Sequence, residues 1–233
     1  MAKYIRLGAS KLIDMKGGSV LEDYLVAVLR LEELYGVART SSIAKILGVT
    51  PATVTKVLQR LAREGYLVWE PYRGFRLAPK GLNIARKVIW RHRVAEVFLH
   101  KVLGFDEVQC HKLAHMLEHM PDEFFYRLYN YLGRPERCPH GNPIPSPDSS
   151  NIETINDDPL SCMRVGEHCI VSRVLCFVSE RLIERAKRLG IGVGSELLVV
   201  GKNEECIEVE IASSGEKACV DYELARIIRC CRR

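Results

Sequence analysis

The first strongly patterned segment of the chain has hydrophobic residues at helical spacing. Five apolar positions follow the i, i+3, i+4, i+7, i+8 template of a single stripe: Leu21, Tyr24, Leu25, Val28 and Leu29. Two shorter helical patterns come next, and they are ended by Gly48 and Gly65. Together these patterns predict a three-helix unit between residues 21 and 65.

The turn between the second and third helical patterns has the signals of a helix-turn-helix corner. Thr40 or Ser41 can cap the second helix, and Thr50 followed by Pro51 provides an N-cap with proline at the first helical position. The segment 47–50 has the length and the glycine that such a corner requires. We expect the third helix to bury Val54, Val57, Leu58 and Leu61.

After the third helix the pattern changes to two short β-like runs. Residues 66–70 and 75–77 flank the turn Pro71-Tyr72-Arg73-Gly74, which predicts a two-stranded wing. In a winged helix-turn-helix the third helix lies in the DNA major groove, so its solvent side should carry groups that reach base edges and phosphates. The candidate DNA-binding residues are Thr50, Ala52, Thr53, Thr55, Lys56, Gln59, Arg60, Tyr72 and Arg73. The same polar surface would also suit a helical subdomain that contacts proteins.

The rest of the chain divides into a helical segment, a linker and a β-rich segment. Residues 79–140 are helical in pattern and long enough to pair with a second copy of the chain. Residues 141–160 lie in a stretch rich in proline, serine and aspartate, which is typical of a linker. Residues 161–233 alternate short β-like runs with one charged helix near 180–189, which predicts a small β-barrel. With a winged helix at residues 1–78, including an extension at 1–18, the fold class is mainly α (α+β).

Charge, hydropathy and cysteine content narrow the function classes. The chain has 233 residues and a formal net charge of +5, which is compatible with a polyanionic partner. No stretch is apolar enough to span a bilayer, and the first 20 residues lack the apolar core of a signal peptide, so we expect a cytoplasmic protein. The nine cysteines include no paired CxxC spacing, which argues against a zinc ribbon. A Cys206–Cys219 bridge across a hairpin turn is one alternative, and buried free thiols are the other.

Histidines concentrate in the helical segment. Five of the seven histidines lie between residues 92 and 119 of this segment: His92, His100, His111, His115 and His119. Spacings of three or four residues place imidazoles and the carboxylates of Glu96 and Glu118 on common helix faces. This mixture of nitrogen and oxygen donors suits iron(II), manganese(II), zinc(II) or cobalt(II). An isolated histidine would be an ordinary core or surface residue, but this set predicts a metal site.

From about Leu21 to its end, the chain resembles the diphtheria toxin repressor (DtxR/MntR) family of metalloregulators. The resemblance rests on the winged helix ending in Tyr72-Arg73-Gly74, Arg91-His92-Arg93 followed by Glu96, the run 111–119, and Gly-Asn-Pro-Ile-Pro at 141–145. It implies a metal-dependent repressor that binds a double-stranded DNA operator as a homodimer and has an SH3-like (FeoA-like) C-terminal module. It also implies a primary regulatory site of Asp23, His115, Glu118 and His119, and an ancillary site of His92, Glu96 and His111.

The sequence departs from the iron-sensing pattern of this family at two positions. Asp23 stands where a methionine is usual, and His115 stands where a cysteine is usual. Both changes replace a soft sulfur ligand with a harder oxygen or nitrogen ligand. The resemblance therefore implies Mn(II) or Fe(II), leaning to manganese, with Zn(II) and Co(II) as in vitro substitutes. The manganese branch's second amino-terminal acidic ligand is replaced by Val26. In the C-terminal module the positions for extra ligands are Val174 and Phe177, so we expect no metal ligand from that module.

The resemblance predicts a mechanism in which metal joins Asp23 to the helical segment and fixes the separation of two recognition helices at about 34 Å. Two other hypotheses stay open. His115-Met116-Leu117-Glu118-His119 fits the H-x-x-E-H pattern of some zinc metallohydrolases. A winged-helix regulator that responds to an organic ligand, or to none, would bind DNA without metal.

Overall fold

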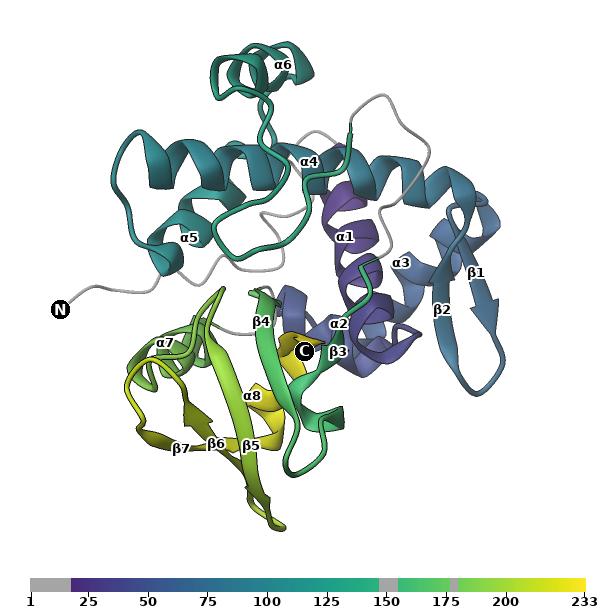
Figure 1. Cartoon of the computed structure of the whole chain (residues 1–233). Helices are drawn as coiled ribbons and strands as arrows, with labels where there is room; N and C mark the ends of the chain where they lie inside the picture. The colour runs from purple at the N-terminus through teal and green to yellow at the C-terminus, as the bar shows by residue number, and fades with distance from the viewer. Residues whose placement is uncertain (1–17, 147–154, 177–179) are drawn as a thin grey trace, which may run out of the picture. The chain divides into compact units, whose positions relative to one another are not determined.

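The computed structural model describes residues 18–146, 155–176 and 180–233 (Figure 1). The extension before Gly18, the middle of the predicted linker and Phe177 lie outside the described residues. The chain forms two compact units, Met1–Ile89 and Trp90–Arg233. Helix α4 (Pro79–Lys101) crosses the division between them.

The first unit is a winged helix-turn-helix. It contains α1 (Gly18–Tyr35), α2 (Thr40–Leu47), α3 (Pro51–Arg63), β1 (Leu67–Glu70) and β2 (Gly74–Leu77). The two strands are antiparallel, with Leu67 opposite Leu77, and they form the hairpin drawn in Figure 1. The predicted helices and wing are confirmed.

The N-cap of α3 matches the prediction, whereas the N-cap of α2 does not. Thr50 caps α3 through its hydroxyl, which accepts a hydrogen bond from the Thr53 amide at 3.2 Å, and Pro51 follows. The predicted cap of α2 at Thr40 or Ser41 is wrong, because its N-cap is Arg39, whose side chain makes no capping bond. The reason is a bridge between Ala38 and Phe75, with amide to carbonyl distances of 3.0 and 2.8 Å, that precedes the extended residue Arg39. The helix can therefore begin only at Thr40.

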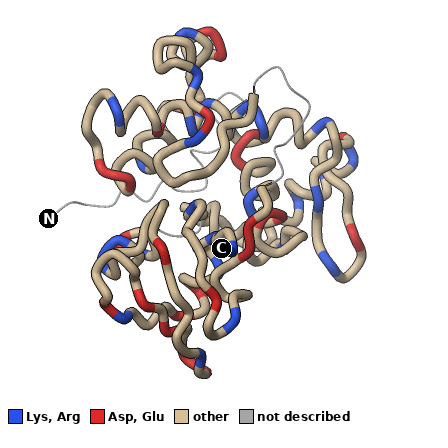
Figure 2. The backbone as a smooth tube through the Cα atoms, viewed as in Figure 1, with Lys and Arg blue, Asp and Glu red and all other residues tan. Residues whose placement is uncertain are grey.

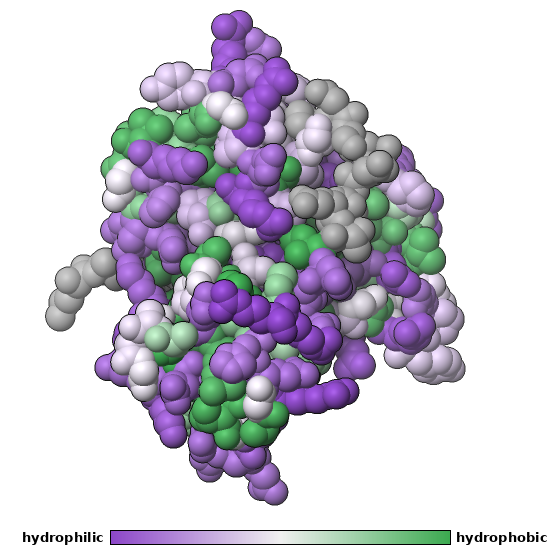
Figure 3. Space-filling view, viewed as in Figure 1, coloured by the Kyte–Doolittle hydropathy of each residue, from purple (hydrophilic) through white to green (hydrophobic). Residues whose placement is uncertain are grey.

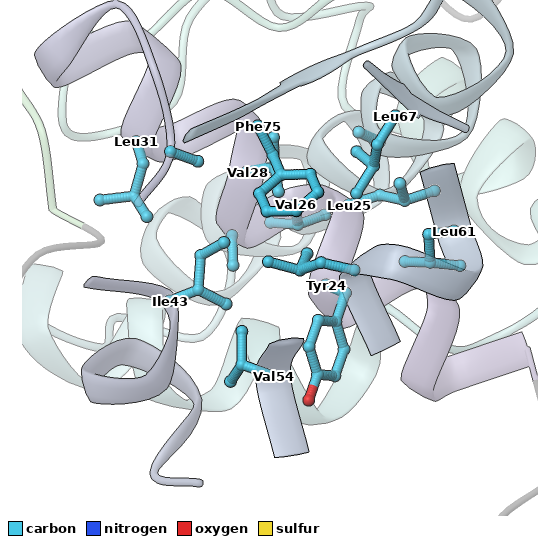
Figure 4. Close-up of a cluster of buried hydrophobic side chains, with 14 of the residues drawn as sticks. Tyr24, Leu25, Val26, Val28, Leu31, Ile43, Val54, Leu61, Leu67 and Phe75 are labelled. Carbon is cyan, nitrogen blue, oxygen red and sulfur yellow. The ribbon is translucent and has the colours of Figure 1, made fainter. Parts of the chain in front are cut away.

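The core of the first unit is apolar and draws on all of its elements (Figure 4). On α3, three of the four predicted positions are fully buried, whereas Val57 is partly buried. Because these side chains point inward, the opposite side of α3 is left to solvent. Residues labelled in Figure 4 include Tyr24, Leu25, Val28, Ile43, Val54, Leu61, Leu67 and Phe75.

The second unit starts with helices that pack around Trp90. Helix α5 (Glu107–Leu117) begins with a capping box in which the Asp106 carboxylate accepts from the Gln109 amide at 2.9 Å. Helix α6 (Asp122–Tyr131) carries aromatic rings against Trp90, with centroid distances of 4.9 to 6.1 Å. Helix α5 ends at Leu117, and Glu118 is its C-cap.

A six-stranded antiparallel sheet makes up the C-terminal part of the second unit, in the order β3-β8-β4-β5-β6-β7. The predicted small β domain is confirmed. The Cys206–Cys219 disulfide is also present, between β6 and β7. The elements are β3 (Asp158–Pro159), the 3-10 turn Leu160–Cys162, β4 (His168–Val174), α7 (Glu180–Arg188), β5 (Glu196–Lys202), β6 (Cys206–Ile211), β7 (Lys217–Asp221), α8 (Tyr222–Ile227) and β8 (Ile228–Arg232).

A buried ionic network fastens the chain where it enters this sheet. The Asp157 carboxylate accepts from Arg173 Nε at 2.7 Å, from Arg229 Nε at 3.0 Å and from the Ser172 hydroxyl at 2.8 Å. Since the Asp157 side chain has no exposed surface, these bonds replace its lost hydration. The two arginines lie on β4 and β8, so the network joins both strands to the entering segment.

Among the described residues, no helix is long and apolar enough to cross a bilayer. On the face drawn in Figure 3, hydrophilic side chains predominate and are interrupted by separate apolar areas.

Candidate nucleic-acid interface and metal centre

The outer side of α3 is polar and accessible. Thr50, Thr53, Lys56, Gln59 and Arg60 are exposed, as predicted. Thr55 is partly buried, and its hydroxyl donates to the Pro51 carbonyl at 2.9 Å. Lys56 and Gln59 therefore offer a cation and an amide that can contact phosphate and base edges, whereas the Thr55 hydroxyl already has a partner within the helix.

The wing presents its turn to solvent. Tyr72 is fully exposed and has a left-handed backbone with φ of 62°, which turns the chain between the two strands. Arg73 lies 3.4 Å from Glu70, and basic residues of the hairpin are visible in Figure 2. Gly74 is required at the end of this turn, because a Cβ there would lie 2.4 Å from the Ala38 carbonyl oxygen. Tyr72 and Arg73 are thus held outward from the unit.

A groove between α3 and the wing contains residues that the sequence analysis missed. It is lined by Thr55, Gln59, Arg63 and Trp69, among others. Trp69 is 60% exposed on β1, although a ring of that size is usually covered. Strand periodicity places Trp69 on the same face as buried Leu67, so the sequence pattern gave no signal for its exposure. We add Arg63 and Trp69 to the candidate interface.

In the second unit three predicted histidines converge. The ring centroids of His92, His111 and His115 are 4.6 to 4.9 Å apart, although they come from two helices. His92 Nε2 lies 3.1 Å from His111 Nδ1, and His111 Nε2 lies 3.3 Å from His115 Nε2. His100, which belongs to neither predicted ligand set, instead contacts the Phe105 carbonyl oxygen through Nδ1 at 2.9 Å.

Two buried carboxylates complete this cluster. Glu96 is 0% exposed, and its Oε1 lies 2.9 Å from His111 Nδ1 and 3.1 Å from His92 Nε2. Glu118 Oε2 lies 2.6 Å from His92 Nδ1, and Glu118 Oε1 lies 3.1 Å from His115 Nδ1. His92 therefore touches both carboxylates, and it connects the two predicted ligand sets.

Three donors in the cluster were not foreseen. His140 Nδ1 lies 3.3 Å and Cys176 Sγ lies 3.8 Å from Glu96 Oε1, and Cys138 Sγ lies 3.9 Å from His140 Nδ1. The triads Glu96, Cys138, His140 and Glu96, His111, Cys176 each have donor atoms within 4.8 Å of one another. The sequence signal was Cys138-Pro139-His140, directly before the glycine-proline segment. We expected no metal ligand from the C-terminal module, and that expectation stays a prediction, but Cys176, which closely follows β4, does bring a thiol to Glu96.

The electrostatics of this cluster favour charged donors. Burial would raise the pKa of Glu96, but the imidazoles of His92 and His140 outweigh burial and hold that pKa well below its usual value. Burial would also raise the pKa of the Cys176 thiol, but nearby His111 lowers it to about 5. The Cys138 pKa is instead raised by burial to about 11. Both downward shifts favour the ionised forms of the Glu96 carboxyl and the Cys176 thiol.

The arrangement fits a divalent metal ion. Glu96 Oε2 and His140 Nε2 are buried, and neither atom has a hydrogen-bond partner in the described part of the chain. Buried polar atoms without partners are costly, and close imidazole nitrogens can share only one proton between each pair. A cation would satisfy these lone pairs together. Nitrogen, oxygen and sulfur donors suit borderline transition metals such as iron(II), cobalt(II) and zinc(II).

The remaining predicted ligands have different settings. His119 follows the end of α5 and is exposed, with its Nε2 3.9 Å from Glu118 Oε1. Asp23 lies on α1 in the other compact unit, so its joining with Glu118 and His119 stays a prediction. Since α5 ends at Leu117, the H-x-x-E-H pattern does not lie on one continuous helix, which disfavours the metallohydrolase hypothesis.

A winged helix with an accessible polar third helix, on the same chain as a buried donor cluster, defines a metal-binding protein of the winged-helix class. Two family models match the chain. Residues 18–75 match the iron dependent repressor, N-terminal DNA binding domain, and residues 78–146 match the iron dependent repressor, metal binding and dimerisation domain. The chain therefore belongs to the iron-dependent repressor (DtxR/MntR) family.

Relatives in two organisms show the extent of this similarity. The HTH-type transcriptional regulator MntR of Bacillus pumilus (strain SAFR-032) is 40% identical over 99 residues, which are 42% of this chain and 68% of that protein. An uncharacterized HTH-type transcriptional regulator of Aeropyrum pernix is 37% identical over 142 residues, which are 60% of this chain and 78% of the relative. The similarity therefore extends beyond the DNA-binding unit.

Solved structures extend the comparison further along the chain. A manganese-dependent transcriptional repressor in complex with manganese superimposes with a TM-score of 0.78 at 28% identity, covering 91% of this chain and 100% of the other. ScaR with bound Zn²⁺ gives a TM-score of 0.79 at 27% identity, covering 91% and 99%. The C-terminal sheet is thus part of the shared fold.

Proposed function

We propose that this chain is a metal-activated DNA-binding repressor that acts as a homodimer in the cytoplasm and controls metal-ion homeostasis. The observation that carries the proposal is the buried cluster of imidazole, carboxylate and thiol donors on a chain that also has a winged helix. In this role the chain is a binding protein without catalytic activity, and its ligands are an operator duplex and a metal ion.

The activating ion is Mn(II) or Fe(II). The structural relatives include a manganese-dependent repressor, and the matching family models are named for iron-dependent repressors. Hard donors favour manganese at the site of Asp23, His115, Glu118 and His119. Zn(II) and Co(II) would bind the same nitrogen and oxygen donors in vitro.

Two sites share the cluster in this proposal. The primary site uses Asp23 with His115, Glu118 and His119. The ancillary site uses the predicted His92, Glu96 and His111, and it gains Cys176, Cys138 and His140 around the same Glu96 carboxylate. His92 touches both carboxylates. It is a ligand of the ancillary site together with Glu96, and its hydrogen bond to Glu118 orients that ligand of the primary site.

The proposed regulation rests on where Asp23 lies in the chain. Its carboxylate is on α1, which packs in the same core as α3, whereas the other ligands belong to the second unit. A bound ion would neutralise the carboxylates that Asp23 must approach. Ordering α1 would then set the spacing of two recognition helices in a dimer at about 34 Å, to match successive major grooves.

The test is a DNA-binding titration with the full chain. A duplex selected from a random library in the presence of Mn(II) is titrated by fluorescence anisotropy with Mn(II), Fe(II), Zn(II) or no metal, at one stated salt concentration. We expect at least about tenfold tighter binding with the activating metal. Equal binding with and without metal would favour the metal-independent regulator.

Asp23→Ala separates the bridge from the rest of the proposal. This variant should keep its metal-independent DNA binding and lose most of the metal response, because the charge that couples the units is gone. Asp23→Asn is the matched control for side-chain size. A full metal response in both variants would contradict the bridge.

A further inference from the structure

Two buried cysteines face each other inside the C-terminal sheet. Cys169 on β4 and Cys230 on β8 are each 1% exposed, and both are free thiols in this structure. Their side chains interact directly, because the contact with Cys230 is the largest influence on the pKa of the Cys169 thiol and lowers it. Neither residue belongs to the donor cluster described above.

The strand register of this pair repeats that of the existing disulfide. In the bonded pair, Cys206 lies opposite Asp221 and Cys219 lies opposite Glu208, so the cysteines are diagonal neighbours. Cys169 lies opposite Arg232 and Cys230 lies opposite Val171, which is the same diagonal of an antiparallel pair. The irregularity in β4 comes after Val171, outside this stretch.

This diagonal has a geometry that a disulfide tolerates. The bonded cysteines have a Cα–Cα distance of 5.6 Å, inside the range of about 4.4 to 6.8 Å that disulfides require. Because β4 and β8 pair in the same antiparallel manner as β6 and β7, residues on the same diagonal should have similar Cα–Cα distances in both strand pairs. A second bridge therefore needs no rearrangement of β4 and β8.

We propose that Cys169 and Cys230 are a second disulfide site, which a low-molecular-weight disulfide such as oxidised glutathione closes while the chain folds and both thiols are still accessible. One cysteine thiolate attacks the glutathione disulfide, forms a mixed disulfide and releases one glutathione thiolate. The other cysteine then attacks the mixed disulfide and releases the second glutathione. The protein loses two electrons and two protons, and two reduced glutathione molecules carry them away.

The position of this bridge gives it a structural role. The Cys206–Cys219 disulfide joins β6 and β7 at one end of the strand order, whereas Cys169 and Cys230 would join β4 and β8 in the other half. About 60 residues separate the second pair in sequence, so its closure would constrain most of this sheet in the unfolded chain. Each half of the sheet would then contain one disulfide between neighbouring strands.

The neighbouring Cys231 supplies a matched control. It follows Cys230 in the chain but is only partly buried, lies opposite Ile170, and its thiol contacts the Asn156 carbonyl oxygen at 3.7 Å. Successive side chains of a strand point to opposite faces, so Cys231 cannot reach Cys169. Pairing should therefore discriminate between two adjacent cysteines.

The experiment compares two forms of the full-length protein: one that carries only the Cys206–Cys219 disulfide, and one that has been oxidised with glutathione. The chain is refolded with oxidised glutathione, its remaining thiols are alkylated, and digested peptides are analysed by mass spectrometry without reduction. We expect the Cys169 peptide linked to the Cys230 peptide, with free cysteines falling from seven to five per chain. The melting temperature should rise by roughly 5 to 15 °C over that of the form with one disulfide.

Variants separate the bridge from general oxidation. Cys231→Ala should keep both the linked peptides and the rise in melting temperature, whereas Cys230→Ala should lose both. Recovery of Cys169 as an alkylated or glutathionylated peptide from oxidised wild type, or linked to Cys231 or Cys162, would overturn the assignment. The result does not depend on metal or DNA binding, so it stands or fails separately from the proposed function.

Discussion

The winged helix exposes its candidate functional residues to solvent, whereas the candidate metal centre buries them. In the winged helix, Lys56, Gln59 and Arg60 are exposed above an apolar core. In the metal centre, Glu96 and His111 are buried among one another, away from water. A surface that recognises a polyanion must stay hydrated and accessible, whereas a metal site gains strength when its donors are desolvated and fixed.

This difference decides how each region should respond to substitution. Removing an exposed group on α3 should change DNA binding and leave folding intact, because substitutions of solvent-exposed side chains usually change stability by less than about 0.5 kcal/mol. Removing a buried donor should disturb several partners together. The following predictions test that contrast, from the largest effect to the smallest.

Glu96→Gln should have the largest effect. The carboxylate is common to both buried triads, so its loss removes one ligand and the negative charge that His92 and His140 face. We expect metal affinity at the buried site to fall by more than about 100-fold, measured by competition with a coloured chelator. His100→Gln, on the same helix but outside the cluster, is the control. Unchanged metal affinity in a folded Glu96→Gln protein would contradict the assignment of the site.

Asp157→Asn tests a buried charge that has no proposed part in binding. It leaves Arg173 and Arg229 without their carboxylate, so we expect a loss of about 3 kcal/mol in the free energy of unfolding. DNA and metal affinities of the folded protein should not change. Denaturant unfolding measures the first quantity, and an effect below about 1 kcal/mol would mean that the network contributes little.

The same carboxylate predicts a pH dependence. Burial would raise the pKa of Asp157, but hydrogen bonds from Arg173 outweigh it, and the pKa in the folded protein lies below its usual value. The stabilisation is therefore complete above the unfolded pKa of about 3.9 and is lost as pH falls through the lower folded value. Wild type and Asp157→Asn should converge in melting temperature at low pH. If the difference in melting temperature between the two proteins stayed constant down to the pH of acid unfolding, the stabilisation would not come from the ionised Asp157 carboxylate.

Gln59→Ala and Lys56→Ala form a matched pair on α3. If Gln59 contacts a base edge, its loss should cost about 1 to 3 kcal/mol on the selected duplex and relax preference at one position. If Lys56 contacts phosphate, its loss should weaken binding to all duplexes and lower the salt slope by about 1. Anisotropy titrations at several salt concentrations separate the two. Identical behaviour of both variants would mean that the groove residues, including Trp69, carry the sequence preference.

Local signals made the first unit largely predictable from sequence. Gly48 ends α2, and Thr50 and Pro51 begin α3, through contacts with residues only a few positions away. The apolar spacing of α3 then leaves only its opposite side available to DNA. The cap of α2 was missed because it depends on Ala38 pairing with Phe75, which is far along the chain.

The metal centre was predictable only as far as helical spacing reaches. His111 and His115 share a turn of α5, and His92 and Glu96 share a turn of α4, so their clustering follows from periodicity. Cys176 is 80 residues from Glu96, and its approach depends on how β4 ends and how the preceding loop places His140. Resemblance directed attention to Val174 and Phe177, and Cys176 between them was overlooked.

The central claim is that metal binding and DNA binding are coupled within one chain. The most direct test measures Mn(II) affinity calorimetrically with and without a saturating amount of the selected duplex. Because coupling is reciprocal, DNA should raise metal affinity by the same factor, at least about tenfold, by which metal raises DNA affinity. A metal affinity that is the same with and without DNA would contradict the account.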